Sequence, residues 1–256
     1  MCGIVGYVGT NNVPNREYFA LDVVLEGLRR LEYRGYDSAG VAMLEGGKIN
    51  FRKKAGKVAG LDEEIARDPL PDSVVGIGHT RWATHGAPTD ANAHPHVVDG
   101  GKLAVVHNGI IENFAELKTE LAAKGYTFAS ETDTEVAATL LGDIMNGEGN
   151  GDLTESMRLT CNRLEGAFTL LALHVDFPDR IVAARRNSPL VIGLGEGENF
   201  LGSDVSGFID YTKNAVEMAN DQIVTITATS YDIIDFAGNK AQGKPFKVEW
   251  DAAAAE

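Results

Sequence analysis

Two hydrophobic periods alternate along the first half of the chain, one typical of helices and one typical of strands. The residues Leu21, Val24, Leu25, Leu28 and Leu31 recur at intervals of three or four, which predicts an amphipathic helix over residues 17–31. Short apolar runs bounded by glycine or polar residues predict strands. These strands span residues 4–8, 39–44, 49–53, 74–79 and 103–107, and further helices are predicted over residues 58–66 and 113–125, from residue 130 and around Cys161.

From Ala167 onward the apolar runs are short and are separated by tight turns rich in glycine, asparagine and aspartate. Strands are predicted over residues 168–175, 181–185, 190–194, 200–203, 223–228 and 231–235. Turns this short join antiparallel neighbours. Mixed helices and strands followed mostly by strands favour a layered α+β sandwich over an alternating parallel fold. No repeat or linker divides the sequence, so a single domain is predicted over residues 1–256.

The composition of this 256-residue chain excludes several classes of function. With 37 acidic against 23 basic residues, its formal net charge is −14, which opposes binding to nucleic acid and to membrane surfaces. No apolar run reaches the roughly 18 residues that span a bilayer, and the N-terminus lacks a signal-peptide pattern, so we expect a cytoplasmic protein. Cys161 lies on the apolar side of a predicted helix, where an inert buried thiol is expected. Only Cys2 remains as a candidate for chemistry.

Cys2 carries a thiol and, once Met1 is removed, a free α-amino group as well. The reference pKa of such an amine is about 7.7–8.0, which suits a general base near neutral pH. Activation of a nucleophile by its own N-terminal amine is an established variant of covalent catalysis. Small Gly3 is expected to leave room for a substrate, and the strand that follows is expected to hold the terminus in place. Taken alone, this stretch still favours a cysteine with no chemical role.

Polar and aromatic motifs recur between the predicted strands and helices. They are residues 31–40 (LEYRGYDSAG), 79–86 (HTRWATHG), 92–96 (NAHPH), 107–109 (HNG) and 132–135 (TDTE). Together with the opening MCGIVG, and over residues 1 to about 204, they resemble the class II glutamine amidotransferases, whose glutaminase domains are N-terminal-nucleophile hydrolases. The resemblance implies a four-layer αββα sandwich with two antiparallel sheets. It also implies hydrolysis of L-glutamine to glutamate and ammonia through a thioester on Cys2, without a cofactor.

The amino-acid sequences of these motifs resemble those of one branch of this family, whose members aminate a sugar phosphate in hexosamine synthesis. Members of that branch continue into two sugar-phosphate-binding domains, which accept the ammonia. This chain ends without them, and a homo-oligomer formed through them is left open. One alternative is a glutaminase domain that serves phosphoribosyl amination or asparagine synthesis. The other is a catalytically silent regulatory module that retains the fold.

Two residues suit the charged ends of free glutamine. The Arg81 guanidinium offers a carboxylate two parallel donors, and its alternative role is a surface ion pair. The resemblance assigns the substrate ammonium to Asp133, whose alternative role is that of an acid stabilised in the first turn of a helix. Thr132 and Glu135 fit a capping box, which leaves Asp133 free for substrate.

Asn108 and Gly109 look like an oxyanion hole, because they supply a side-chain amide and a backbone N–H directly after a predicted buried strand. An ordinary Asn-Gly turn is the alternative. Residues 110–111 lack the alternation expected of a hairpin strand, which weakens that alternative.

The loop that follows Arg81 carries further candidates. The resemblance supports Thr84 and His85 as substrate-binding residues. Trp82 is interpreted as a loop anchor or lid, with a core aromatic as an equal alternative. Arg34, in the earlier motif, is expected near the cysteine as a supporting residue or in a structural ion pair with an acid.

Four histidines raise the question of a metal: His79, His94, His96 and His107. Their spacings match no zinc pattern, and attack by a thiol needs no metal. We therefore predict no metal site.

Overall fold

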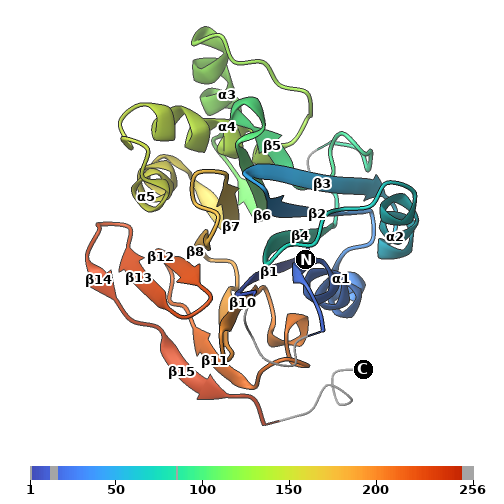
Figure 1. The fold of residues 1–256 in the computed structure, drawn as a ribbon. Helices are drawn as coiled ribbons and strands as arrows, with labels where there is room; N and C mark the ends of the chain where they lie inside the picture. The colour runs from blue at the N-terminus through green and yellow to red at the C-terminus, as the bar shows by residue number, and fades with distance from the viewer. Residues whose placement is uncertain (1, 12–16, 85, 250–256) are drawn as a thin grey trace.

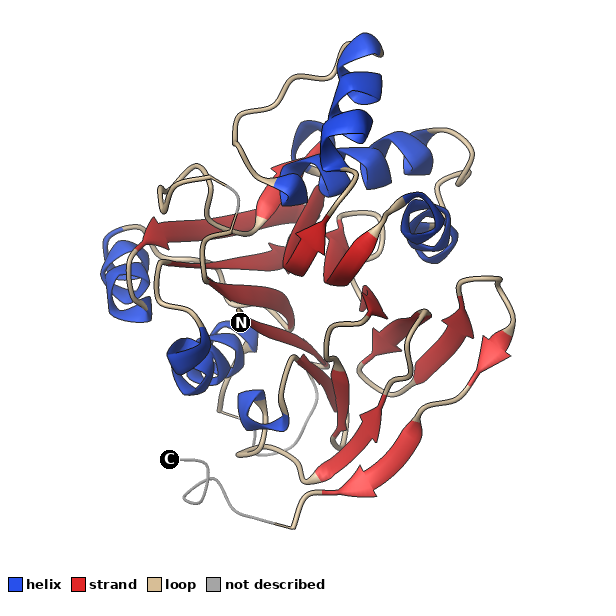
Figure 2. Ribbon diagram, turned by 180° about the vertical axis from the view of Figure 1, so that it is seen from behind, coloured by secondary structure: helices blue, strands red, loops and turns tan. Residues whose placement is uncertain are grey.

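The computed structural model describes residues 2–11, 17–84 and 86–249. Within these ranges the chain forms two antiparallel sheets with helices on both outer faces (Figures 1 and 2). The helices are α1 (Ala20–Leu31), α2 (Val58–Arg67), α3 (Phe114–Ala123), α4 (Asp133–Asn146) and α5 (Leu153–Arg163), with short 3-10 turns η1 (Glu32–Arg34), η2 (Asp99–Gly101) and η3 (Val205–Gly207).

The first sheet is built around β1 (Gly3–Gly9), and in the described chain its order is β15-β11-β9-β10-β1-β4-β2-β3. β1 pairs with β4 on one side and with β10 on the other, so that Val5 lies opposite both Gly78 and Gly202. The first strand of the chain is therefore an interior strand of its sheet. The remaining strands are β2 (Ser38–Glu45), β3 (Lys48–Ala55), β4 (Val75–Arg81), β9 (Val191–Leu194), β10 (Glu198–Gly202), β11 (Asn214–Glu217) and β15 (Lys244–Lys247).

The second sheet has the order β14-β13-β12-β8-β7-β6-β5 among the described residues. β6 and β7 form a long antiparallel pair that runs from Leu103 opposite His174 to Ile111 opposite Gly166. The strands of this sheet are β5 (His96–Val98), β6 (Leu103–Ile111), β7 (Gly166–His174), β8 (Arg180–Arg186), β12 (Gln222–Thr227), β13 (Tyr231–Asp235) and β14 (Lys240–Ala241).

Three hydrophobic clusters define the layers. Ile4 of β1 and Leu171 of β7 belong to the cluster between the sheets. Val5 of β1 lies in a second cluster with residues of α1 and α2. Phe168 of β7 lies in a third cluster with residues of α3, α4 and α5. The predicted four-layer αββα sandwich is therefore confirmed, and Figure 1 shows the two groups of helices at opposite sides of the molecule.

The alternation of side chains along β1 explains its continuous apolar sequence. Successive residues of a strand point to opposite faces, so Ile4 and Val8 enter the cluster between the sheets. Val5 and Tyr7 enter the cluster beneath α1. Because both faces are covered, all seven residues of β1 are buried. A strand fixed in this way gives the residue before it, Cys2, a defined position.

The element bounds differ from the prediction in ways that bear on function. α1 begins at Ala20, β4 continues to Arg81 and β6 continues to Ile111. The strands β5, β11, β14 and β15 were not predicted. No helix within the described ranges is long and apolar enough to cross a membrane.

Candidate active site

Cys2 directly precedes β1 and is held there by side chains from the neighbouring strands. The Gly3 N–H donates to Thr80 Oγ1 at 3.2 Å, and the Ile4 N–H donates to Ser203 Oγ at 3.0 Å. These bonds anchor the start of the chain, which would fray if it were free. Neither Thr80 nor Ser203 was predicted from the sequence, because a lone hydroxyl in a strand gives no sign of its partner.

Gly3 is required by close packing within the sandwich. A Cβ atom built on Gly3 would lie 2.6 Å from Thr80 Oγ1 and 2.7 Å from Leu31 Cβ. Gly3 is also buried and does not line the cavity beside Cys2. Gly3 was predicted to leave room for a substrate, but the structure shows that its small size is needed for packing against β4 and α1.

The Cys2 thiol is partly exposed and contacts the backbone of Trp82. The Trp82 N–H donates to Sγ at 3.1 Å, and Sγ lies 3.6 Å from the Trp82 carbonyl oxygen. Burial raises the pKa of the Cys2 thiol, while the Trp82 N–H and the Arg81 charge act in the opposite direction. The thiol thus keeps its proton at neutral pH, and nucleophilic attack requires a base.

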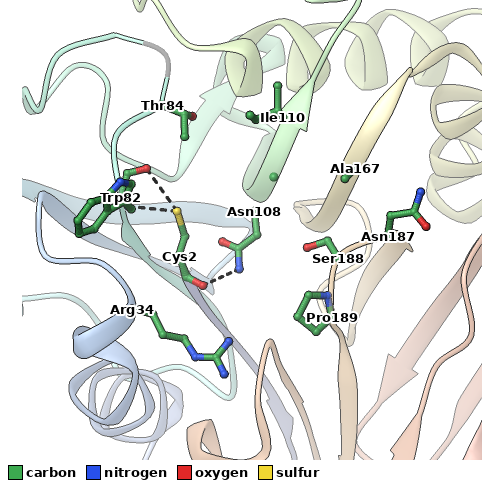
Figure 3. Close-up of a pocket in the computed structure, with 11 residues that line it drawn as sticks. Cys2, Arg34, Trp82, Thr84, Asn108, Ile110, Ala167, Asn187, Ser188 and Pro189 are labelled. Atoms are coloured by element: carbon green, nitrogen blue, oxygen red, sulfur yellow. Dashed lines mark hydrogen bonds between the residues drawn. The ribbon is translucent and has the colours of Figure 1, made fainter.

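A cavity of about 340 Å³ opens beside the thiol, a size typical of small-molecule sites. Figure 3 shows Cys2, Trp82 and Asn108 grouped on one side of it and Asn187, Ser188 and Pro189 on the other. Six of the predicted site residues line this cavity: Cys2, Arg34, Trp82, Thr84, Asn108 and Gly109. The other lining residues are Ile110, Ala167, Asn187, Ser188 and Pro189.

The segment 187–189 was missed by sequence analysis. It connects β8 to β9 and reads as an ordinary polar turn with a proline. Its place at the cavity follows from the pairing of β8 with β7, which brings Arg186 opposite Phe168 at the end of β7 nearest to Asn108.

Asn108 and Gly109 lie inside β6, opposite Thr169 and Phe168 of β7. The prediction that they follow a strand, and the alternative of an Asn-Gly turn, are both wrong. Gly109 has φ +113°, and a Cβ atom there would collide with the Ala167 carbonyl oxygen. Only glycine fits this conformation. Both residues have a low strand propensity, and it is their pairing with β7 that extends the strand through them.

The Asn108 side chain connects the nucleophile to the other sheet. Its Nδ2 donates to the Cys2 carbonyl oxygen at 2.9 Å, and its Oδ1 lies 3.0 Å from Nε2 of His79 on β4. The amide is therefore held at both ends, beside Cys2, with its residue 6% exposed.

Arg81 ends β4 and is buried, so the alternative of a surface ion pair is wrong. Its Nη1 donates to the Ala87 carbonyl at 3.2 Å and its Nη2 donates to the Gly86 carbonyl at 3.1 Å. Burial lowers the pKa of Arg81, while Cys2, Asp133 and Asp37 act to raise it. Arg81 does not line the cavity, and its observed contacts hold the loop after β4.

Asp133 begins α4 and joins it to β6. Its Oδ2 accepts from the Ile111 N–H at 2.8 Å, and its Oδ1 lies 4.0 Å from His107 Nδ1. Thr132 caps the helix as predicted, accepting from the Glu135 N–H at 3.3 Å. Asp133 is 4% exposed and does not line the cavity, so its role toward substrate stays a prediction.

The Glu135 carboxylate departs from the predicted capping box. It accepts from the backbone N–H groups of Ala129 and Ser130, at 2.8 and 2.6 Å. The acid therefore fixes the two residues that lead into the Thr132 cap, and the Thr132 N–H donates to Ser130 Oγ instead.

The remaining candidates lie around the mouth of the cavity. Trp82 is 47% exposed and packs edge-on against Tyr36, with ring centroids 5.5 Å apart, so the core-aromatic alternative is wrong. Thr84 lines the cavity, and His85 lies outside the described residues. Arg34 lines the cavity and also forms the structural ion pair with an acid, Asp204; its role in supporting Cys2 stays a prediction.

The four histidines are buried and lie close to one another. The rings of His79 and His94 stack with centroids 4.1 Å apart, and His96 and His107 bond to the hydroxyls of Thr132 and Thr134. Burial is the largest cause that lowers the pKa of His79, His94 and His96. Among the described residues no group of His, Cys, Asp and Glu has an arrangement that would hold a metal ion.

The chain belongs to the glutamine amidotransferase family. The family model described as a glutamine amidotransferase domain matches residues 79–210, a stretch that includes Arg81, Asn108 and Asp133. The glutamine–fructose-6-phosphate aminotransferase (isomerizing) of Corynebacterium diphtheriae is 78% identical over 256 residues, which are 100% of this chain and 41% of the relative. The enzyme of the same name from Corynebacterium efficiens is 77% identical over the same shares. The chain thus spans about two fifths of these relatives.

A solved structure shares the fold. The glutamine phosphoribosylpyrophosphate amidotransferase from B. subtilis, complexed with ADP and GMP, superposes with a TM-score of 0.75 and 24% identity, over 93% of this chain and 50% of that chain. This likeness shows the fold alone, and it agrees with the layered arrangement of two antiparallel sheets and outer helices described above.

Proposed function

We propose that this chain is a single glutaminase domain that hydrolyses L-glutamine to glutamate and ammonia, with Cys2 as the nucleophile. One observation carries the proposal: the Cys2 thiol and the Asn108 amide lie together at one cavity, at the start of an interior strand. Membership of the glutamine amidotransferase family supports glutamine as the substrate.

The amino group of Cys2 serves as the base once Met1 has been removed. The amine takes the thiol proton, directly or through a water molecule, and sulfur attacks the carboxamide carbon of glutamine. The C–N bond then breaks, the departing nitrogen takes the proton from the ammonium, and a γ-glutamyl thioester remains. Water attacks this thioester, which releases glutamate and restores the thiol.

Asn108 and Gly109 stabilise the oxyanion of each tetrahedral intermediate. A side-chain amide nitrogen has two N–H groups, and Asn108 donates one of them to the Cys2 carbonyl. The other N–H, with the backbone N–H of Gly109, is offered to the oxyanion. Donors of this kind are effective because they are in place before charge develops.

Arg81 and Asp133 supply opposite charges for the substrate carboxylate and ammonium. The support is electrostatic: both residues are buried, and although burial lowers the pKa of Arg81, the Asp133 charge acts in the opposite direction. Thr84 and His85, on the loop that Arg81 holds, add donors to the carboxylate, and Trp82 covers the cavity beside the thiol. Arg34 supports the same end of the cavity through its pair with Asp204.

We further propose that the ammonia serves the amination of fructose 6-phosphate by further domains of a longer protein. The support is the 78% identity to a relative of that name, of which this chain spans 41%. Any homo-oligomer would form through those domains. A cytoplasmic location goes with this proposal, because phosphorylated sugars are retained inside cells. Other acceptors have weaker support, since the phosphoribosylpyrophosphate amidotransferase is only 24% identical.

The two cysteines provide the test of the glutaminase. Glutamate release from glutamine is measured for the wild type, Cys2→Ala and Cys161→Ala, with and without a thiol-alkylating agent. Cys161 is fully buried, which raises its pKa far above the usual range of a thiol, so it is a matched control. We expect Cys2→Ala and the alkylated wild type to be inactive and Cys161→Ala to keep its rate. Equal loss in both variants would overturn the assignment.

A further inference from the structure

His79 lies beneath the cavity and joins the two sheets at the nucleophile. It sits on β4, opposite Ile4 of β1 and Gly40 of β2, and its side chain is fully buried. Its Nε2 lies 3.0 Å from Oδ1 of Asn108, which belongs to the second sheet. The residue itself does not line the cavity, so any effect on chemistry must pass through Asn108.

The direction of this hydrogen bond follows from the other end of the amide. The Cys2 carbonyl oxygen can only accept a hydrogen bond, so the group 2.9 Å from it must be the amide nitrogen of Asn108. The amide oxygen therefore faces His79. Because that oxygen also only accepts, Nε2 of His79 must carry the proton and donate it.

The surroundings of His79 hold the ring in this form. Burial, followed by the charge of His107, lowers the pKa of His79 to about 3, so the ring is neutral at physiological pH. A neutral imidazole has one N–H, and Asn108 requires it on Nε2. The His94 ring stacks on His79 at an interplanar angle of 26°, and His94 Nδ1 accepts from the His107 N–H of β6. The ring plane is therefore fixed against the second sheet.

We propose that His79 is a positioning residue, whose Nε2–H holds the Asn108 amide with its nitrogen toward Cys2 and toward the oxyanion that forms there. Without this donor the amide can turn over and present its oxygen, which repels a developing negative charge. The inference rests on the proposed glutaminase, since only that reaction creates the oxyanion.

Two amide substitutions of different length test the role. His79→Gln extends an amide N–H to about the place of Nε2, whereas the N–H of His79→Asn ends near Nδ1 and is too short to reach Asn108. We expect His79→Asn to lower kcat toward the level of Asn108→Ala, a loss of about 10²–10³. KM should change little, because the oxyanion exists only along the reaction. His79→Gln should recover much of the lost rate.

A double-mutant cycle separates positioning from a general structural effect. In the Asn108→Ala background, His79→Asn should cost no further activity, because the group on which it acts is gone. His174→Asn is the control for placing Asn at a buried histidine, since His174 is 2% exposed and lies at the end of β7 remote from Ala167. It should keep full kcat. Rates are expressed per reactive Cys2 thiol, counted with an alkylating agent, so that partly folded preparations do not distort them.

The outcomes distinguish this inference from the proposed function. Full kcat in His79→Asn, or equal losses with and without the Asn108 amide, overturns the inference while glutaminase activity stands. An inactive wild type overturns the proposed function. In either case the ¹⁵N spectrum of histidine-labelled wild type tests the hydrogen bond itself, with the His79 signal assigned from His79→Gln. We expect the Nε2-protonated tautomer at neutral pH, and an Nδ1-protonated or charged ring overturns the inference.

Discussion

Substitution of Asp133 separates a structural role of its carboxylate from a role in substrate binding. Oδ2 accepts the buried Ile111 N–H at 2.8 Å, and the residue is 4% exposed. Asp133→Ala leaves that N–H without an acceptor, which should lower the free energy of unfolding by about 1–3 kcal/mol. Asp133→Asn keeps an amide oxygen at this place and loses only the charge, so most of the stability should remain.

The charge should matter only for a substrate that carries an ammonium group. A charge-assisted hydrogen bond contributes about 1.5–3 kcal/mol, which corresponds to a loss of roughly 10- to 150-fold in kcat/KM. Asp133→Asn should therefore lose this factor with glutamine and keep its rate with glutaramate, the amide that lacks the α-amino group. Asp133→Ala should show the same loss with glutamine and reduced stability as well, so it is the more impaired variant.

The measurements are urea unfolding and glutamate or glutarate release from the two amides. Asp152→Asn is the matched control, because Asp152 also accepts a backbone N–H at a helix start, from Glu155 at 2.9 Å, and does not line the cavity. Equal losses with both amides in Asp133→Asn would refute the charge role and leave Asp133 as the tie between β6 and α4. An unchanged stability of Asp133→Ala would refute the argument from the buried N–H.

Two further predictions concern the backbone and the terminus. Gly109→Ala should lower the free energy of unfolding by at least the roughly 1–3 kcal/mol of a strained backbone, and should reduce glutaminase activity, because its Cβ meets the Ala167 carbonyl. Gly60→Ala on α2 is the control, because a Cβ there has its nearest neighbours at 3.8 and 4.0 Å; it should be neutral or stabilising by up to ~1 kcal/mol. If thermal unfolding shows Gly109→Ala to be the more stable of the two variants, the packing argument is wrong. Retention of Met1 converts the Cys2 amine to an amide and should cost about 10²–10⁴ in rate. A preparation that intact mass shows to carry Met1 throughout, yet is fully active, would exclude the amine as base.

Much of the fold was predictable because most elements pack one face on a hydrophobic cluster. The spacing of Val24 and Leu28 in α1 and the apolar run of β1 arise because these residues are buried in a hydrophobic cluster. β15 was missed for the opposite reason. All four of its residues are exposed, and its place is determined by hydrogen bonds to β11, which leave no pattern in its own sequence.

Most residues of the candidate site could be predicted because they belong to the motifs, but their arrangement in space could not. Asn108 and Gly109 were predicted to follow the strand over residues 103–107, whereas pairing with β7 keeps both residues in β6. His79 was predicted only as a motif residue and as a metal candidate, and its hydrogen bond was missed because the partner comes from the other sheet. Contacts between sheets depend on how the layers stack, which local periodicity does not encode.

The interior position of β1 has a consequence for the order of events on the ribosome. The strand acquires its second neighbour, β10, only when residues 198–202 have been made. At roughly 5–20 residues per second, synthesis of the intervening chain of about 200 residues takes ~10–40 s. During that time β1 belongs to an unfinished sheet, with one of its two neighbours still missing. The strand that positions Cys2 is therefore completed late, by a segment that lies about 200 residues further along the chain.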